Sequence, residues 1–414
     1  MGEPRSVSSS QALRLSNTAS VLRLLRSSGP ATASDLVERT GLVRTTVHAV
    51  CGELIALGWA TELVPIRPVG DGRPGRSARR YAFRPDAGFV VGVDLGVNTV
   101  RVLVADLAGT AVAEDSQRFA DRLLPGDERL EVARGTITRV LARAGVGEQD
   151  VLAAAIGVPG PVDQGRRRTT ARPELMPGIA GVDLHEALAA PSWVTSVDND
   201  SNLAALGERW RGIATEADDV VMVLAGERMG AGILMDGRLV RGRDGGAGEL
   251  SFFHLVEGVG NTDGIAMLAR ELGERAVADG WDPPSDGPVT AETVLTAAAD
   301  GDSVAVGLVD QLGQRFARVA ATLDTLFNPQ ILVFGGGVAD AGTGFLPAIH
   351  RHLPDALARI MPHPTPKPPR IEASTLGDRV VVTGAVRLAL DLVDDHHLGG
   401  RGAPLRSAPR ATVA

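Results

Sequence analysis

Hydrophobic residues between positions 16 and 57 recur at the spacing of three short amphipathic helices. The first pattern stops at Gly29, and the second opens with Thr32 and Asp35 at the spacing of a capping box. The third runs from about Val43 to Leu57 and keeps one apolar stripe along its length. Helices joined by a tight glycine turn are typical of a helix-turn-helix, although helical protein–protein modules share this pattern.

The face of the third helix opposite that stripe is polar near its N-terminal end. It carries Arg44, Thr45 and His48, and Thr46 lies beside them. An arginine can pair with guanine through two hydrogen bonds, and a threonine offers a hydroxyl or a methyl group to a base edge. We therefore predict that Arg44, Thr45, Thr46 and His48 read the major groove of double-stranded DNA.

Two segments after the third helix have strand character and enclose a long basic tip. Residues 59–64 and 80–84 are the expected strands, and the tip contains Gly-Arg-Pro-Gly-Arg. This tip resembles the core of an AT-hook, whose arginines lie in a narrow minor groove of negative potential. We predict minor-groove contacts for Arg73 and Arg76, and a winged helix-turn-helix domain over residues 16–84.

Charge is distributed unevenly between this N-terminal part and the rest of the chain. Residues 1–84 carry twelve Arg against six acidic residues, whereas residues 85–414 hold 30 basic and 44 acidic residues. A basic segment on an acidic body indicates a polyanion-binding module, because a phosphate backbone attracts clustered arginines. A solvated basic surface is the plainer alternative.

The composition excludes several classes of protein. At 414 residues, 44% of them hydrophobic, the chain is long enough for two or three domains. It holds no run of about 18 apolar residues and no apolar secretion signal at its start. Cys51 is its single cysteine, which excludes an internal disulfide and a zinc site of several thiolates. We expect a cytoplasmic protein without a membrane segment, a metal or a cofactor, with metal ligation by His and carboxylate side chains as the open alternative.

From residue 89 onward, buried strand patterns alternate with turns and helices, which predicts an α/β body. The strand patterns lead into short polar or glycine-rich motifs: Asp94-Leu-Gly96, Asp198-Asn-Asp200, Gly245-Gly-Ala-Gly-Glu249 and Gly335-Gly-Gly337. We expect this body to span residues 85–394, with a second lobe from Val220 onward. Residues 1–15 and 395–414 are expected to be disordered ends.

This ordered series of motifs resembles the ROK family, named for its repressors, open reading frames and sugar kinases. The resemblance covers about residues 16–392. It implies an α/β fold with a winged helix-turn-helix in front of a two-lobed, actin-like ATPase (ribonuclease H-like) body. It also implies a cleft between the lobes and a homodimer or homotetramer.

The resemblance also implies roles for individual residues. In family kinases an Asp-x-Gly-x-x-Thr turn holds ATP phosphates, and an Asn-Asp pair and a Gly-Glu motif bind sugar hydroxyls. The counterparts of the phosphate-binding turn are Asp94, Gly96 and Thr99. The counterparts of the sugar-binding residues are Asn199, Asp200 and Glu249. Asp200 matches the general base of the kinases, and residues 335–337 match the loop beside adenosine.

Three departures from the family pattern weaken the kinase chemistry. Where the kinases have Gly-Thr-Gly, this chain reads Gly226-Glu227-Arg228, and a carboxylate there repels phosphate. The family histidine that binds sugar and zinc is replaced by Phe252, with His254 as the candidate substitute. The cysteine positions of the family fall on Glu257, Val259 and Gly264. We therefore expect packing, and not zinc, to hold that region.

Together these features predict a DNA-binding transcriptional regulator, a repressor of carbohydrate uptake or catabolism genes. A sugar-type effector binds the body without being phosphorylated and changes the spacing of the DNA-reading parts. The main alternative is an ATP-dependent sugar kinase of the ROK family, which the joint presence of Asp94 and Asp200 favours. Two plainer alternatives are a body that serves only as an oligomerisation scaffold, and a role of residues 198–200 in capping the next helix.

Overall fold

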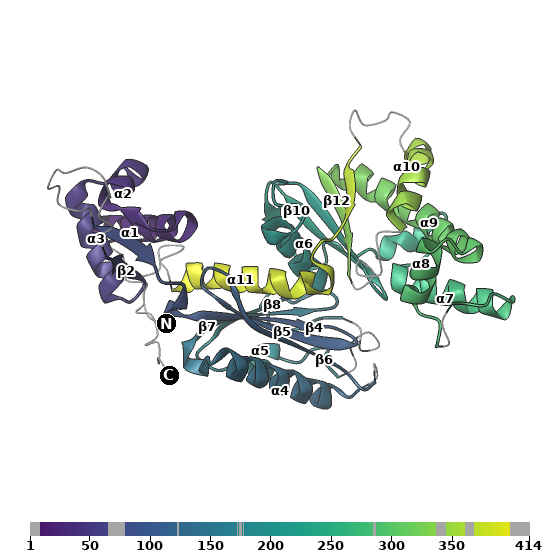
Figure 1. Cartoon of the computed structure of the whole chain (residues 1–414), viewed down its shortest axis with the longest axis horizontal. Coiled ribbons are helices and arrows are strands. Elements are labelled where there is room, and N and C mark those ends of the chain that lie inside the picture. Colours follow the sequence, from purple (N-terminus) through teal and green to yellow (C-terminus); the bar gives the residue numbers. More distant parts are fainter. Residues whose placement is uncertain are drawn as a thin grey trace.

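The computed structural model describes residues 9–64, 79–121, 124–171, 173, 176, 178–284, 287–336, 345–360 and 368–397 (Figure 1). Arg73, Arg76 and Gly337 lie outside the described residues. Within these ranges, no helix is both long and apolar enough to cross a lipid bilayer. The chain forms an N-terminal head (residues 9–83) and a body (residues 89–397) with two sheets (Figure 1).

The head combines helices with a small antiparallel sheet, as the sequence predicts. Its elements are α1 (Ser9–Ser28), β1 (Ala31–Thr32), α2 (Ala33–Thr40), α3 (Arg44–Ala56), β2 (Ala60–Leu63) and β3 (Arg80–Phe83). The described strands lie in the order β1-β3-β2. Because α1 begins at Ser9, residues 9–15 are helical, and the expectation of a disordered end there is wrong. Ala12, Leu13 and Leu15 are strong helix formers, which extends the first helix toward the N-terminus.

Local sequence signals set the ends of the head helices. The predicted capping box is present, because the Thr32 hydroxyl accepts from the Asp35 amide and the Asp35 carboxylate accepts from the Thr32 amide. Gly41 ends α2 with a φ of 71°, a left-handed conformation that favours glycine. The following helix, α3, presses its buried stripe against Trp59 and the other helices of the head.

The first lobe of the body is a sheet covered on both faces. Its described strands lie in the order β6-β5-β4-β7-β8, antiparallel across β6, β5 and β4 and parallel from β4 to β8. The strands are β4 (Phe89–Leu95), β5 (Thr99–Asp106), β6 (Ala111–Arg118), β7 (Val151–Val158) and β8 (Val194–Asn199). The helices are α4 (Gly126–Ala144), α5 (Leu184–Leu188), α6 (Asp200–Arg211) and α11 (Val380–His396).

The second lobe repeats the same strand pattern. Its described strands lie in the order β11-β10-β9-β12-β13, antiparallel on one side of β9 and parallel on the other. The strands are β9 (Val220–Ala225), β10 (Met229–Met235), β11 (Arg238–Leu239), β12 (Ile331–Gly335) and β13 (Arg370–Ala373). The helices are α7 (Ile265–Ala278), α8 (Ala291–Ala299), α9 (Ser303–Phe327) and α10 (Leu346–Ile360). This duplicated α/β architecture confirms the predicted two-lobed fold class.

Two helices lie between the lobes. α11 packs on β4 and β7 of the first lobe, while α6 packs on β9 and β10 of the second. α6 and α11 also pack against each other (Figure 1). The outer faces of the two sheets are covered by α4 in the first lobe and by α9 and α10 in the second. α6 therefore connects the end of β8, which carries Asn199, to both lobes.

Candidate functional site

The polar face of α3 is open to solvent. Arg44, Thr45 and His48 are exposed, and Thr46 is partly buried. The Arg44 guanidinium donates to the Ser34 hydroxyl at 2.6 Å, which links the start of α3 to the start of α2. The α3 residues predicted to read DNA thus lie together near the N-terminal end of one helix, where a recognition helix meets base edges.

His48 is held in place by the sheet of the head. Its Nδ1 atom lies 2.9 Å from the hydroxyl of Tyr81 on β3, and the two rings meet edge to face. Tyr81 is buried, and burial raises its pKa.

Val43 was not among the residues predicted to contact DNA. It is 65% exposed at the start of α3 and offers an apolar surface of the kind that contacts a thymine methyl.

In the body, Asp94 stands at the end of β4 on the turn predicted to hold phosphate. Gly96 and Thr99 close this turn, because the Gly96 amide donates to the Thr99 carbonyl at 3.0 Å. The buried guanidinium of Arg129 stabilises the turn by donating to the carbonyls of Gly96 and Val97. The three predicted turn residues are therefore brought together.

Asn199 and Asp200 have different surroundings although they are adjacent. The Asn199 side chain caps α6 by accepting from the amides of Ser201 and Asn202, and it donates to the Gly160 carbonyl at 2.9 Å. The capping alternative therefore holds for Asn199. The Asp200 carboxylate accepts from the amide and the hydroxyl of Ser201, and its own backbone amide adds a further hydrogen bond.

Three acidic side chains of the site influence one another. Burial raises the pKa of Asp200 to about 7, and nearby Glu249 raises it further against the hydrogen bonds from Ser201. Burial and then the Asp200 carboxylate raise the pKa of Asp94 to about 7. Burial also raises the pKa of Glu249, whose side chain still reaches solvent. Neighbouring carboxyl groups with raised pKa values are typical of a site that binds hydrogen-bond donors or cations.

The turn between β9 and β10 is occupied by two ion pairs. Glu227 accepts two hydrogen bonds from Arg270 on α7, at 2.8 and 3.0 Å. Arg228 donates to the Thr262 hydroxyl at 2.6 Å and lies 3.5 Å from Asp263. The expectation that the Glu227 carboxylate is free to repel phosphate is therefore too simple, because Arg270 neutralises its charge. Arg228 is held in turn by Thr262 and Asp263.

The segment that carries Glu257, Val259 and Gly264 is held by an arginine and by packing. Arg315 on α9 donates to the carbonyl of Asn261 at 3.0 Å, and Val259 is buried. Among the described residues, no group of three or more His, Cys, Asp and Glu side chains is arranged to hold a metal ion. His254 is exposed, and its Nδ1 atom lies 2.9 Å from the Gly260 carbonyl. The contacts of the described residues do not join His254 to the three carboxylates, because the short helix at 251–255 turns it toward Gly260.

Sequence reasoning missed the arginines that connect the two lobes. Asp198 is 3% exposed and pairs with Arg166 of the first lobe at 2.7 Å and with Arg241 of the second lobe at 2.8 Å. Gln164 adds a hydrogen bond to the Arg243 carbonyl at 3.2 Å. These contacts hold the loop that carries Glu249 against the first lobe. The sequence shows Asp198 directly before the helix cap Asn199, but it does not show that Arg166 and Arg241 are the partners of Asp198.

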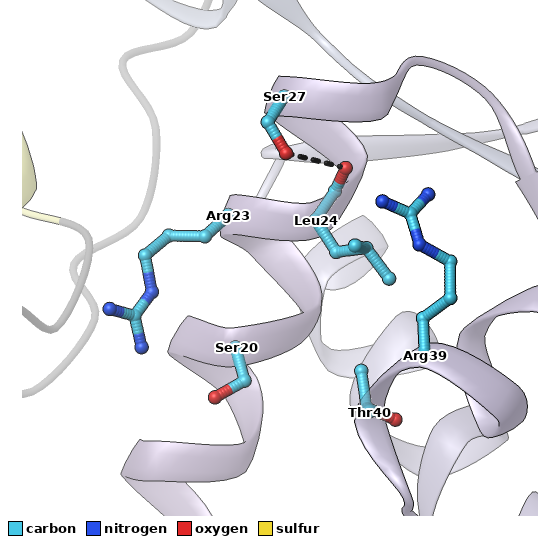
Figure 2. A pocket seen from close by; sticks show the side chains of 6 residues that line it. All are labelled: Ser20, Arg23, Leu24, Ser27, Arg39 and Thr40. Atoms are coloured by element: carbon cyan, nitrogen blue, oxygen red, sulfur yellow. Dashed lines mark hydrogen bonds between the residues drawn. The ribbon is translucent and has the colours of Figure 1, made fainter.

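A pocket of about 370 Å³ lies on the head between α1 and α2 (Figure 2). Its lining residues are Ser20, Arg23, Leu24, Ser27, Arg39 and Thr40. Figure 2 shows the Ser27 hydroxyl turned onto the Leu24 carbonyl, and Arg39 donates to Ser28 at 2.6 Å. None of the predicted site residues lines this pocket.

Family models match both parts of the chain. A model described as ROK family matches residues 90–392, and a model described as the IclR helix-turn-helix domain matches residues 15–63. The xylose repressor of Caldicellulosiruptor bescii is 24% identical over 369 residues, which are 84% of this chain and 89% of the relative. The N-acetylglucosamine repressor of Escherichia coli is 27% identical over 348 residues, 80% and 83% of the two chains.

Solved structures give the same picture of the fold. A ROK family transcriptional regulator, a homologue of the E. coli MLC protein, matches with a TM-score of 0.70 at 22% identity over 92% of this chain and 97% of its own. A ROK family glucokinase from Streptomyces griseus, in complex with glucose and AMPPNP, matches with a TM-score of 0.61 at 26% identity over 73% and 100%. The regulator thus covers more of this chain than the kinase does.

Proposed function

This chain belongs to the ROK family, and from that premise we propose that it is a DNA-binding transcriptional regulator that responds to a sugar. The observation that carries the proposal is an exposed recognition helix, with Arg44, Thr45 and His48 on its surface, joined to a ROK body. The two named relatives that cover at least 80% of this chain are repressors of xylose and N-acetylglucosamine systems by name. Repression of carbohydrate genes is therefore the activity that we assign.

We place a sugar-type effector at Asp200 and Glu249, beside Asp94. Carboxylates accept hydrogen bonds from hydroxyl groups. Asp200 and Glu249 have no ion pair in the described part of the chain, while Arg101 attracts Asp94. A site built from such acceptors rejects ligands without hydroxyls. The effector is not phosphorylated in this proposal, because Glu227 and Arg228 fill the turn where the kinases hold ATP phosphates.

Operator DNA is the proposed macromolecular partner. Thr46 joins the α3 contacts, and Arg73 and Arg76 stay predicted minor-groove contacts. A homodimer or homotetramer in the cytoplasm would place two heads on one operator, whose half-sites lie about one helical turn or a multiple apart.

The proposal is tested by selecting binding sites from random double-stranded DNA with the full-length protein. The selected site is then titrated by fluorescence anisotropy at several salt concentrations, where we expect tight binding that weakens steeply with salt. Arg44→Ala should lower the affinity about tenfold or more, because it removes a base contact. Arg14→Ala is the control: it removes one positive charge from α1 and should lower the DNA affinity less than Arg44→Ala does. Failure to select any sequence would contradict the regulator.

The effector is sought by adding D-xylose, N-acetylglucosamine and glucose to the same complex. A sugar that releases or tightens the DNA and raises the melting temperature identifies the effector class. A flat thermal shift with every sugar favours the scaffold alternative.

A sugar kinase is the second candidate, favoured by the Asp94–Asp200 pair and by the match to a glucokinase. ATP-dependent phosphorylation of a hexose that disappears in Asp200→Asn would establish it.

A further inference from the structure

The head contacts the body through an ion pair between two helices that lie 368 positions apart in the sequence. Arg26 on α1 pairs with Asp394 near the C-terminal end of α11. The Arg26 side chain is 14% exposed and the Asp394 side chain is 34% exposed, so the pair is partly buried. Nearby Asp391 pairs with Arg387 of its own helix, and Arg26 also attracts Asp391 while Arg387 attracts Asp394. Removal of either partner would leave a partly buried charge without its counterion.

Apolar packing continues across the same junction. The buried core of the head, including Leu25 and Phe83, belongs to one continuous hydrophobic cluster with Leu388 and Val393 of α11. Figure 1 shows the head beside one end of α11. The hydrophobic core therefore continues from the head into the first lobe, where α11 contributes to it.

α11 is fixed in turn to α6 by direct backbone contact. A Cβ atom on Gly384 of α11 would lie 1.7 Å from the carbonyl oxygen of Leu203 on α6. A Cβ atom on Gly207 of α6 would lie 2.5 Å from the carbonyl oxygen of Val380. No side chain separates the two helices at this crossing, so one cannot shift without the other.

The other end of α6 reaches the carboxylate site. Asp200 is the first residue of α6, and Asn199 caps the same helix. We propose that α6 and α11 form one rigid unit that carries a displacement at Asp200 to the DNA-binding head, with the Arg26–Asp394 ion pair as the joint. The consequence for gene control rests on the proposed function, whereas the geometry of the joint does not.

The joint is tested in the full-length protein by pulsed electron paramagnetic resonance. Nitroxides are attached to Glu38→Cys on α2 and Thr138→Cys on α4, both exposed positions. Cys51 is buried, and burial raises its pKa to about 12, so it stays unlabelled. We expect one narrow distance between head and body in the absence of other substitutions.

Arg26→Gln and Asp394→Asn should each replace that distance by a broad distribution. The double variant should be no broader than either single variant, because both changes remove the same pair. Arg14→Gln is the matched control, since it breaks a pair of α1 with Glu53 that stays inside the head. A narrow, unchanged distance in both single variants would overturn the joint.

The rigid unit is tested by Gly384→Ala, which forces α6 and α11 apart. We expect a shifted mean distance, whereas Gly135→Ala on α4 should leave it unchanged because a Cβ there meets only Arg139 at 3.5 Å. A folded Gly384→Ala protein with the original distance would overturn the coupling. Should that variant fail to fold, Gly207→Ala tests the same coupling, because its Cβ atom makes a less severe clash, at 2.5 Å from the Val380 carbonyl oxygen.

Failure of this inference is distinguishable from failure of the proposed function. The distances are measured without DNA or sugar, so a protein that selects no DNA sequence can still show the joint. A protein that selects DNA but shows a broad distance before any substitution in the joint contradicts the inference alone.

Discussion

Asp198 and Asp200 lie two residues apart, yet the protein surrounds them in opposite ways. The carboxylate of Asp198 is buried and receives two guanidinium groups, Arg166 and Arg241, from the two lobes. Asp200 faces two other acidic groups, Asp94 and Glu249, and has no ion pair in the described part of the chain. The charge of Asp198 is therefore balanced by counterions, and the charge of Asp200 is not.

The Asp198 carboxylate stabilises the fold, whereas the Asp200 carboxylate lowers its stability. A buried pair with good hydrogen bonds ties its elements together, and its loss leaves charges without counterions. Carboxyl groups that repel one another lower stability, and such arrangements are concentrated at functional sites. This contrast favours an architectural role for Asp198 and supports the proposed ligand-binding role of Asp200.

The largest expected effect follows from breaking the balanced region. Asp198→Asn leaves Arg166 and Arg241 without their shared carboxylate, so we expect the free energy of unfolding to fall by about 3 kcal/mol. Urea unfolding measures this loss. Asp244→Asn, which removes the exposed partner of Arg243, should change stability by less than about 0.5 kcal/mol. Similar losses in both variants would remove the distinction.

Neutralising the unbalanced region should have the opposite sign. The folded pKa of Asp200 is about 7 and its ordinary value is 3.8, so the folded protein holds a proton that the unfolded chain releases. The resulting stability is present below about pH 4 and is lost as the pH rises through 7. Asp200→Asn should therefore raise the melting temperature at pH 8, by the equivalent of about 1 kcal/mol, and change it little near pH 4. A destabilised Asp200→Asn protein at pH 8 would place Asp200 among the structural residues.

The smallest effect is expected at the Glu227–Arg270 pair. Both side chains are partly exposed, so Glu227→Gln should lower the free energy of unfolding by about 0.5 kcal/mol. Arg270→Gln should cost a similar amount, and the double variant no more than either single one. Additive losses, measured by urea unfolding, would show that the two residues do not act as a pair.

Short-range features of the head were predictable because their causes are local. The capping box of Thr32 and Asp35 and the left-handed Gly41 follow from residues within one turn of each other. The buried stripe of α3 follows from helical periodicity. Family membership was likewise predictable, since it depends on the order of motifs along the chain, and the matched family model confirms it.

The candidate site was predictable in position but not in its electrostatics. The motifs located Asp94, Asp200 and Glu249, and the fold brings all three within electrostatic reach of one another. His254 was proposed as a sugar-binding residue because it lies two positions after Phe252, yet its side chain is directed to Gly260. Proximity in sequence does not determine which way a side chain points in an irregular loop.

The amino-acid sequence by itself determined the helices of the head, the order of strands and helices in the body, and the motif residues that the lobes bring together. Only the tertiary structure decided which charges are balanced: Arg241 meets Asp198 across 43 positions, and Arg26 meets Asp394 across 368. Helix and strand signals act over a few residues, whereas an ion pair depends on where packing places two distant segments. The same packing leaves Asp200 without a counterion and connects its helix to the DNA-binding head.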